Sequence, residues 1–281
     1  GNTWSPLSLV FGNSSATELA VIGNAAPVQD AKTGRILLPF CRNNSQVFFT
    51  YSDDDGASWA PPVEVPSATR SDWRWIGLGP PAGVQMPTGR VVIPSYHGPF
   101  HWDDGTITHV HTLYTDDLGA TWHIGCVFEE ASDPYLSNEN QAAVLSNGSL
   151  LLNARTVFTH RAQAVSNDGG ETCTNMELVE DMPQPFDGCE GSTVSHNATL
   201  YFTNPDEDSL VGYRYNLTLK ASHDGGSSWH NLRVVDTSPS GYSALTIAPD
   251  GALGVLYETS DVLKPVMKPL HIVYQAALPR A

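Results

Sequence analysis

A motif of the form S/T-x-D-x-G-x-x-W recurs along the chain and constrains its fold more than any other feature. It spans residues 52–59, 115–122 and 222–229, and a degraded copy spans 166–173 and ends in Cys173 instead of Trp. The chain also opens with the end of one copy, at Trp4. The closing positions 4, 59, 122, 173 and 229 are 55, 63, 51 and 56 residues apart. Such regular spacing is typical of a repeated supersecondary unit.

Each residue of the motif fits a tight turn between two strands. The Asp carboxylate can accept hydrogen bonds from backbone N–H groups of its own turn, the Gly supplies a positive φ, and the Trp packs back over the hairpin. A calcium loop is the alternative interpretation, and the run from Asp53 to Gly56 superficially resembles one. No Glu closes that loop, however, and no helices flank it. The motif therefore predicts structural turns, and no ligand cluster implies a metal or a cofactor.

Short β-rich runs lie between these turns, among them RILLPF, QVFFTYS, GRVVIPSYH and SLLLNAR. With 24 Gly and 20 Pro, a helix-breaking residue occurs about once in six positions, which leaves little room for long helices. A unit of roughly 55 residues has room for four strands, the size of one propeller blade. We therefore expect residues 1–281 to form a single all-β domain of about five blades.

The charge balance excludes one class of partner. The chain has 14 Lys plus Arg against 30 Asp plus Glu, a formal net charge of −16. Non-specific nucleic-acid binding depends on Lys and Arg that neutralise phosphates, so we expect no nucleic-acid partner. We also expect no transmembrane segment, because the sequence has no apolar run of 18 residues.

Sequons and cysteines bear on the compartment. Five N-x-S/T sequons indicate a glycoprotein of the secretory pathway, extracellular or lysosomal. They stand at Asn13, Asn43, Asn147, Asn197 and Asn216. The four cysteines, if paired, permit three connectivities. They are Cys41, Cys126, Cys173 and Cys189, and no C-x-x-C spacing among them favours zinc.

Three segments between the turns carry a further signal. They are SNENQAAVLSNGSLLLNAR (137–155), NPDEDSLVGYRYNLTLKASHDGG (204–226) and SGYSALTIAPDGALGVLYE (240–258). In order and content they resemble the exo-α-sialidases (neuraminidases), whose repeated turn is called the Asp box. The resemblance covers essentially the whole chain. It implies a six-bladed β-propeller and an enzyme that removes terminal sialic acid from sialylated glycoconjugates.

The resemblance also implies a role for each matched residue. Tyr242 would be the nucleophile and Glu139 its base, while Arg155 and Arg214 would hold the substrate carboxylate. Glu258 would support one arginine. These residue types suit the chemistry, because sialic acid carries a carboxylate on the carbon under attack and a neutral Tyr avoids the repulsion that an Asp or Glu nucleophile would meet. Tyrosine has a pKa of about 10, so it needs an adjacent base. The expected outcome is retention of configuration.

Part of the family pattern is not in this sequence. The F-R-I-P segment, which bears the first arginine of the family's triad, and the following loop with the general acid would precede GNTW. We therefore expect part of the first blade to be absent and an N-terminal fragment of the same precursor to supply both groups. Two alternatives stay open: a non-catalytic sialoglycan-binding propeller, and a trans-sialidase-type transferase.

Two further features stay unassigned by the sequence. Arg70 and Arg74 flank Trp73 and Trp75, and this cluster fits either a substrate rim or cation–π packing. The segments GNAAPVQDAKTGRILLPF and GLGPPAGVQMPTGRVVIPSYH resemble blade segments without catalytic residues.

Overall fold

The structure is a computed structural model that describes residues 3–12, 20–99, 107–207, 210–261 and 271–278. Within these residues the regular structure is β-strand, apart from one 3₁₀ turn, η1 (Pro66–Ala68). The prediction of an all-β chain is confirmed. None of the helical structure in these ranges has the length and apolar content needed to cross a membrane.

In each of the first two sheets, two short strands pair with the same edge of one longer strand, and two further strands follow on its other side. The first contains β1 (Ile22–Gly23), β2 (Val28–Gln29), β3 (Ile36–Arg42), β4 (Gln46–Ser52) and β5 (Val63–Glu64). The second contains β6 (Trp75–Leu78), β7 (Val84–Gln85), β8 (Val91–Gly98), β9 (His109–Thr115) and β10 (His123–Val127). All neighbouring strands are antiparallel.

The remaining strands form two more sheets. The third contains β11 (Asn140–Val144), β12 (Leu150–Ala154), β13 (His160–Ser166) and β14 (Glu177–Pro183). The fourth contains β15 (Ser192–His196), β16 (Thr199–Pro205), β17 (Tyr215–Ser222), β18 (His230–Ile247), β19 (Leu253–Thr259) and β20 (His271–Leu278).

The described residues thus form four sheets, where the repeat arithmetic predicts about five units. The difference arises at β18, which is 18 residues long. Its first part, up to Pro239, pairs with β17, and its second part, from Ser240, pairs with β19. One continuous strand therefore joins two groups of strands that the turn spacing separates.

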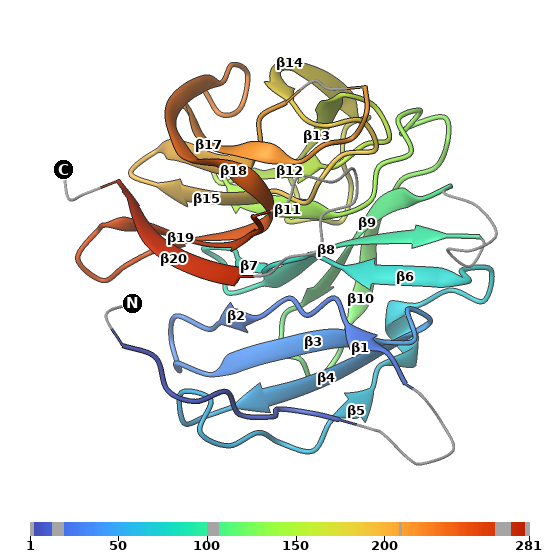
Figure 1. Cartoon of the computed structure of the whole chain (residues 1–281). Helices are drawn as coiled ribbons and strands as arrows, with labels where there is room; N and C mark the ends of the chain where they lie inside the picture. The colour runs from blue at the N-terminus through green and yellow to red at the C-terminus, as the bar shows by residue number, and fades with distance from the viewer. Residues whose placement is uncertain (1–2, 13–19, 100–106, 208–209, 262–270, 279–281) are drawn as a thin grey trace.

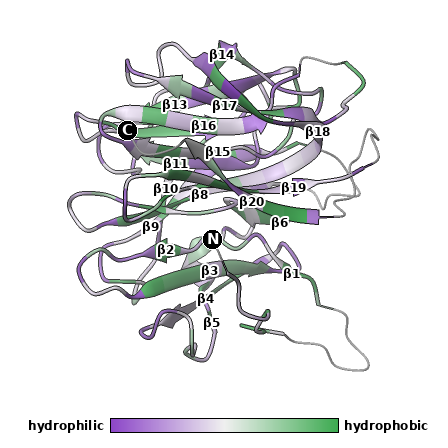
Figure 2. Cartoon of the chain, turned by 60° about the vertical axis from the view of Figure 1, so that its left-hand side comes forward, coloured by the Kyte–Doolittle hydropathy of each residue, from purple (hydrophilic) through white to green (hydrophobic). Residues whose placement is uncertain are grey.

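The sheets follow one another around the molecule in chain order, which gives a propeller-like arrangement (Figure 1). Each packs its apolar side chains against the next. Leu37 and Phe49 of the first sheet share a cluster with Ile76 of the second, and Val92 of the second shares one with Leu152 of the third. Hydrophobic colour runs along strands such as β3, and hydrophilic colour gathers in many of the turns (Figure 2). The core therefore lies between the sheets, as burial of alternating strand residues requires.

The repeated motif forms the predicted turns, which join β4 to β5, β9 to β10, β13 to β14 and β17 to β18. In the first copy the Asp54 carboxylate accepts hydrogen bonds from the Ser58 N–H at 2.8 Å and from the Ser58 hydroxyl at 2.6 Å. Gly56 has φ +83° and donates its N–H to the Ser52 hydroxyl. The other copies repeat these contacts around Asp117, Asp168 and Asp224. The turn interpretation is confirmed for these four copies.

The degraded copy explains one cysteine pair. Cys173, which stands where the other copies have Trp, forms a disulfide with Cys126 of β10 across 47 residues of sequence. The bond thus links the second and third sheets. At the equivalent position of the second copy of the motif, Trp122 is buried. Cys41 and Cys189 are free and buried.

The sequons occupy different settings. Asn43, Asn147 and Asn197 are exposed residues of hairpin turns, whereas Asn216 is half-buried within β17. Asn13 lies outside the described residues. Their glycosylation stays a prediction.

Candidate active site

The third sheet brings Glu139 and Arg155 side by side. Glu139 immediately precedes β11 and Arg155 immediately follows β12, and these strands pair so that Asn140 faces Ala154. The Arg155 N–H donates to the Glu139 carbonyl at 2.8 Å, which continues the ladder by one residue. Arg155 Nη1 also donates to Glu139 Oε2 at 2.7 Å. A single hairpin is therefore sufficient to form this ion pair between residues 16 positions apart in the sequence.

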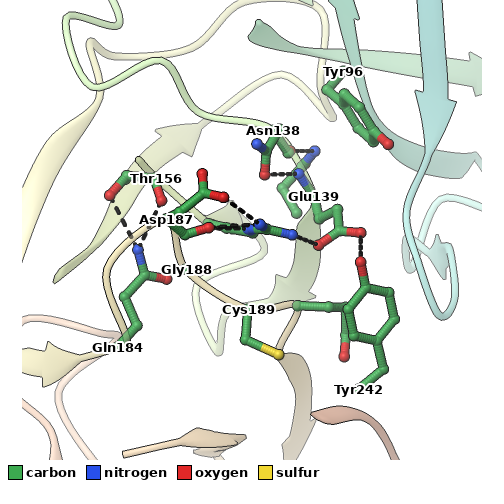
Figure 3. Close-up of polar contacts among 12 residues, drawn as sticks. Tyr96, Asn138, Glu139, Thr156, Gln184, Asp187, Gly188, Cys189 and Tyr242 are labelled. Carbon is green, nitrogen blue, oxygen red and sulfur yellow. Dashed lines mark hydrogen bonds and ion pairs between the residues drawn. The ribbon is translucent and has the colours of Figure 1, made fainter. Parts of the chain in front are cut away.

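Tyr242 reaches the same carboxylate from the fourth sheet. It lies in β18, and its phenol OH donates to Glu139 Oε1 (Figure 3). Burial, with the neighbouring Glu139 carboxylate, raises the pKa of Tyr242 well above its ordinary value. Tyr242 therefore rests as a neutral phenol that is hydrogen-bonded to the Glu139 carboxylate.

The two predicted arginines border this pair. Arg155 donates from Nε and Nη2 to the Asp187 carbonyl, at 2.8 and 2.5 Å. Burial opposes the charge of Arg155, but the Glu139 carboxylate raises its pKa, so the guanidinium stays charged. Arg214 immediately precedes β17, donates from Nη2 to the Gly188 carbonyl at 3.0 Å and lies 5.8 Å from the Tyr242 ring centroid.

Glu258, on β19, supports the site through the backbone. Its Oε2 accepts a hydrogen bond from the Tyr242 N–H at 3.2 Å. Burial raises the pKa of Glu258, opposed by the Tyr242 N–H and the charge of Arg214. The contact that the structure shows is thus to Tyr242, whereas the resemblance implies support of an arginine.

Tyr242, Glu139 and the two arginines line a pocket of about 620 Å³ together with residues to which the sequence analysis assigned no role. Its full lining is Asn24, Ala25, Trp75, Pro80, Tyr96, Asn138, Glu139, Arg155, Asp187, Arg214 and Tyr242. The pocket thus contains two cationic groups beside the Tyr–Glu pair. A volume of this size is ordinary for a small-molecule site.

Four of the additional residues, Asn24, Ala25, Pro80 and Tyr96, come from the two segments interpreted above as lacking catalytic residues. Asn24 donates to the Tyr96 hydroxyl at 3.2 Å, and Tyr96, on β8, lies on the other side of the Glu139 carboxylate from Tyr242 (Figure 3). Trp75, on β6, also lines the pocket, while the Arg70 guanidinium lies 5.3 Å from the Trp73 ring centroid. The aromatic and polar residues in those segments were a usable signal, but their spacing alone does not place them in a pocket.

Comparison with known proteins gives one family model and many relatives. The model described as "BNR repeat-like domain" matches residues 1–255. Sialidase-3 of Homo sapiens is 32% identical over 202 residues, which cover 61% of this chain and 46% of that protein. A sialidase of Bacteroides fragilis is 29% identical over 231 residues, covering 78% of this chain and 40% of that protein.

Solved structures agree with these matches. The Hadza microbial sialidase Hz136 superimposes with a TM-score of 0.82 at 28% identity, covering 99% of this chain and 57% of that chain. A leech intramolecular trans-sialidase shares the fold, with a TM-score of 0.67 at 22% identity over 84% of this chain and 37% of that chain. The chain spans about half the length of the curated relatives that it matches.

Proposed function

The chain belongs to the sialidase family with BNR-like repeats, and on this basis we propose that it acts as a retaining exo-α-sialidase on sialylated glycoconjugates. One observation carries the proposal. The Tyr242 phenol donates to Glu139, which is also paired with Arg155, and this line of three groups borders a pocket that includes Arg214. A binding module would need the arginines but not a tyrosine held against a base.

In the first step, Tyr242 Oη forms a bond to the anomeric carbon of the sialoside as the bond to the leaving-group oxygen breaks, and that oxygen takes a proton from the general acid proposed below. The Tyr242 proton passes to Glu139, which already accepts its hydrogen bond. Burial raises the pKa of Tyr242, which favours proton transfer that accompanies bond formation. Water then attacks the anomeric carbon from the face that the leaving group has vacated, Tyr242 Oη leaves and regains its proton from Glu139, and the configuration is retained.

Arg155 and Arg214 would bind the substrate carboxylate. A guanidinium pairs with a carboxylate through charge-assisted, two-pronged hydrogen bonds. Both arginines already have donors committed to backbone carbonyls of Asp187 and Gly188, which limits the directions in which their remaining donors point. The substrate carboxylate would therefore be held in one orientation beside Tyr242.

We propose that a segment outside this sequence supplies the third arginine and the general acid and completes a six-bladed ring with part of the first blade. An N-terminal fragment of the same precursor fits this role. Within the described ranges β20 pairs with β19 alone, so its other edge is available to a further strand. Trp4 reaches this strand, with its ring 6.0 Å from that of Tyr274, so the chain preceding Trp4 would begin beside it.

The predicted compartment belongs to the same proposal. A disulfide between Cys126 and Cys173 is characteristic of proteins that fold in an oxidising environment. Exposed sequons at Asn43, Asn147 and Asn197 fit glycosylation there. We therefore propose a glycoprotein of the secretory pathway, extracellular or lysosomal.

A fluorogenic sialoside assay of the native protein and of Tyr242→Phe tests the activity. We expect hydrolysis by the native protein and a loss of at least about 1,000-fold in kcat for the variant, because the nucleophilic oxygen is removed. An Asp187→Asn variant is the control, because Asp187 carries the other carboxylate among the residues that line the pocket. Absence of hydrolysis by the native protein would favour the non-catalytic binding alternative.

The reaction products distinguish a sialidase from the trans-sialidase-type transferase. Hydrolysis releases free sialic acid, whereas transfer releases a new sialoside or an internal ether. Proton NMR of the first product distinguishes these outcomes and also reports whether the configuration is retained. An inverted first product would contradict the tyrosyl glycoside.

A further inference from the structure

Glu190 is a buried carboxyl group beside the site that the proposed reaction does not use. It lies in the loop between β14 and β15, and it is 1% exposed. Its Oε2 accepts a hydrogen bond from the Ser243 N–H at 2.8 Å, while its Oε1 has no hydrogen-bond partner in the described part of the chain. Burying a carboxyl group costs free energy unless it is hydrogen-bonded, so its one hydrogen bond in the described residues indicates a structural role.

The contact falls on an irregular part of β18. The pairing of β18 with β19 shifts register between Ser240 and Ser243, and Tyr242 lies within this bulge. A bulge withdraws backbone groups from the strand ladder, and buried N–H groups need another acceptor. Here two consecutive amides find carboxyl groups: the Tyr242 N–H donates to Glu258 and the Ser243 N–H donates to Glu190.

These two acceptors reach the bulge from different elements. Glu258 comes from β19, the neighbouring strand, whereas Glu190 comes from the loop that also supplies Asp187 and Gly188 to the arginines. Both carboxyl groups also line a small cavity of about 150 Å³ that Tyr242 lines as well. The backbone on the C-terminal side of Tyr242 is thereby tied to the loop that orients Arg155 and Arg214.

We propose that Glu190 is a positioning residue, which holds the backbone at Ser243 so that the Tyr242 hydroxyl stays directed at Glu139. The inference rests on the proposed function for its kinetic consequence, but the backbone contact itself can be tested without any activity.

The role depends on hydrogen-bond acceptance and side-chain length rather than on negative charge. Burial raises the pKa of Glu190 well above its ordinary value; the Ser243 N–H and Arg161 oppose this rise, and the Glu139 carboxylate adds to it. Arg161 directs hydrogen bonds to Asn153, to Gln184 and to the Cys189 carbonyl. A neutral side chain of the same length with an acceptor oxygen should therefore replace Glu190.

Three variants separate these properties. Glu190→Gln keeps length and acceptor, Glu190→Asp keeps the carboxyl group but is one methylene shorter, and Glu190→Met keeps length without an oxygen acceptor. We expect Gln to retain kcat within about 3-fold, and Asp and Met to lose about 10- to 100-fold in kcat with KM within about 2-fold, because the reacting oxygen is misplaced. Gln163→Asn shortens another buried side chain by the same methylene and should leave kcat unchanged.

Amide hydrogen exchange of residues 240–247 supplies the second readout. Loss of the Ser243 bond should raise exchange there about 10-fold in Glu190→Asp and Glu190→Met, but not in Glu190→Gln or Gln163→Asn. Unchanged exchange in both Asp and Met variants would overturn the proposal, as would loss of kcat in Glu190→Gln equal to that in Glu190→Met. Altered exchange in a protein that hydrolyses no sialoside would leave the backbone contact established and remove the proposed function. If Glu190→Asp does not fold, Glu190→Met decides.

Discussion

At the residue scale, the candidate site depends on close packing as much as on charge. Gly77, on β6, lies against Tyr96: a Cβ on Gly77 would stand 2.2 Å from the Tyr96 ring. That separation is far below van der Waals contact, so any side chain at position 77 has to displace the ring. The absence of a side chain on Gly77 is thus what allows Tyr96 to line the pocket.

Gly77→Ala should therefore alter substrate binding. We expect a loss of about 1–3 kcal/mol in the free energy of unfolding from overpacking, and an increase in KM for a sialoside as Tyr96 moves. Gly23→Ala is the matched control, because a Cβ on this strand glycine meets no atom within 4 Å. Urea unfolding and steady-state kinetics provide the measurements. Equal behaviour of the two variants would contradict the assigned position of Tyr96.

At the element scale, the Asp-box turns depend on an ionised carboxylate. Hydrogen bonds from Ser228, from its side chain and its backbone, and from Ser222 lower the pKa of Asp224 to about 2 from an ordinary value of 3.8. A depressed pKa in the folded state means that the stabilisation is complete above pH 3.8 and is lost as pH falls through about 2.

Asp224→Asn should consequently be less stable than the wild type at neutral pH, and the difference in Tm between the two should shrink as pH falls from 4 towards 2. Thermal unfolding at closely spaced pH values measures this. Ser228→Ala should show part of the same loss, because it removes one donor to the carboxylate. A difference in Tm that stayed constant down to pH 2 would show that the turn does not depend on the charge.

The disulfide between Cys126 and Cys173 is the second stabilising feature at this scale. By the loop-entropy argument, closing 47 residues contributes up to about 4 kcal/mol to the free energy of unfolding. Reductant should lower the urea midpoint of the wild type accordingly and should have no effect on the Cys126→Ser, Cys173→Ser double variant. An unchanged midpoint in wild-type protein whose free thiols have increased by two would refute this contribution.

At the scale of the whole molecule, the prediction concerns the mass of the active protein. Native mass spectrometry of active protein should give a mass above the 30.3 kDa of residues 1–281, before glycan mass is added, because the proposed active site needs a third arginine and a general acid from a further segment. A folded, monomeric species of the 30.3 kDa chain that hydrolyses sialosides would exclude the partner segment.

Local patterns were sufficient for much of this protein. The Asp-box turns form through hydrogen bonds among residues at most four positions apart, so their sequence motif predicts them directly. The Glu139–Arg155 pair is likewise local, since a single hairpin joins its members. Both features depend on backbone geometry between residues that are near in sequence, although the sequence analysis predicted only the turns.

Other features depend on how the sheets pack. Tyr242 meets Glu139 across 103 residues of sequence, and Glu190 meets Ser243 across 53. The choice of Cys126 with Cys173 among three pairings, and the contribution of Trp75 and Tyr96 to the pocket, also required the positions of neighbouring sheets. The sequence by itself determined the repeating turns, the all-β class and the chemical identity of the candidate catalytic groups. The tertiary structure alone decided which of those groups touch, because contacts between sheets depend on side-chain packing that no local pattern encodes.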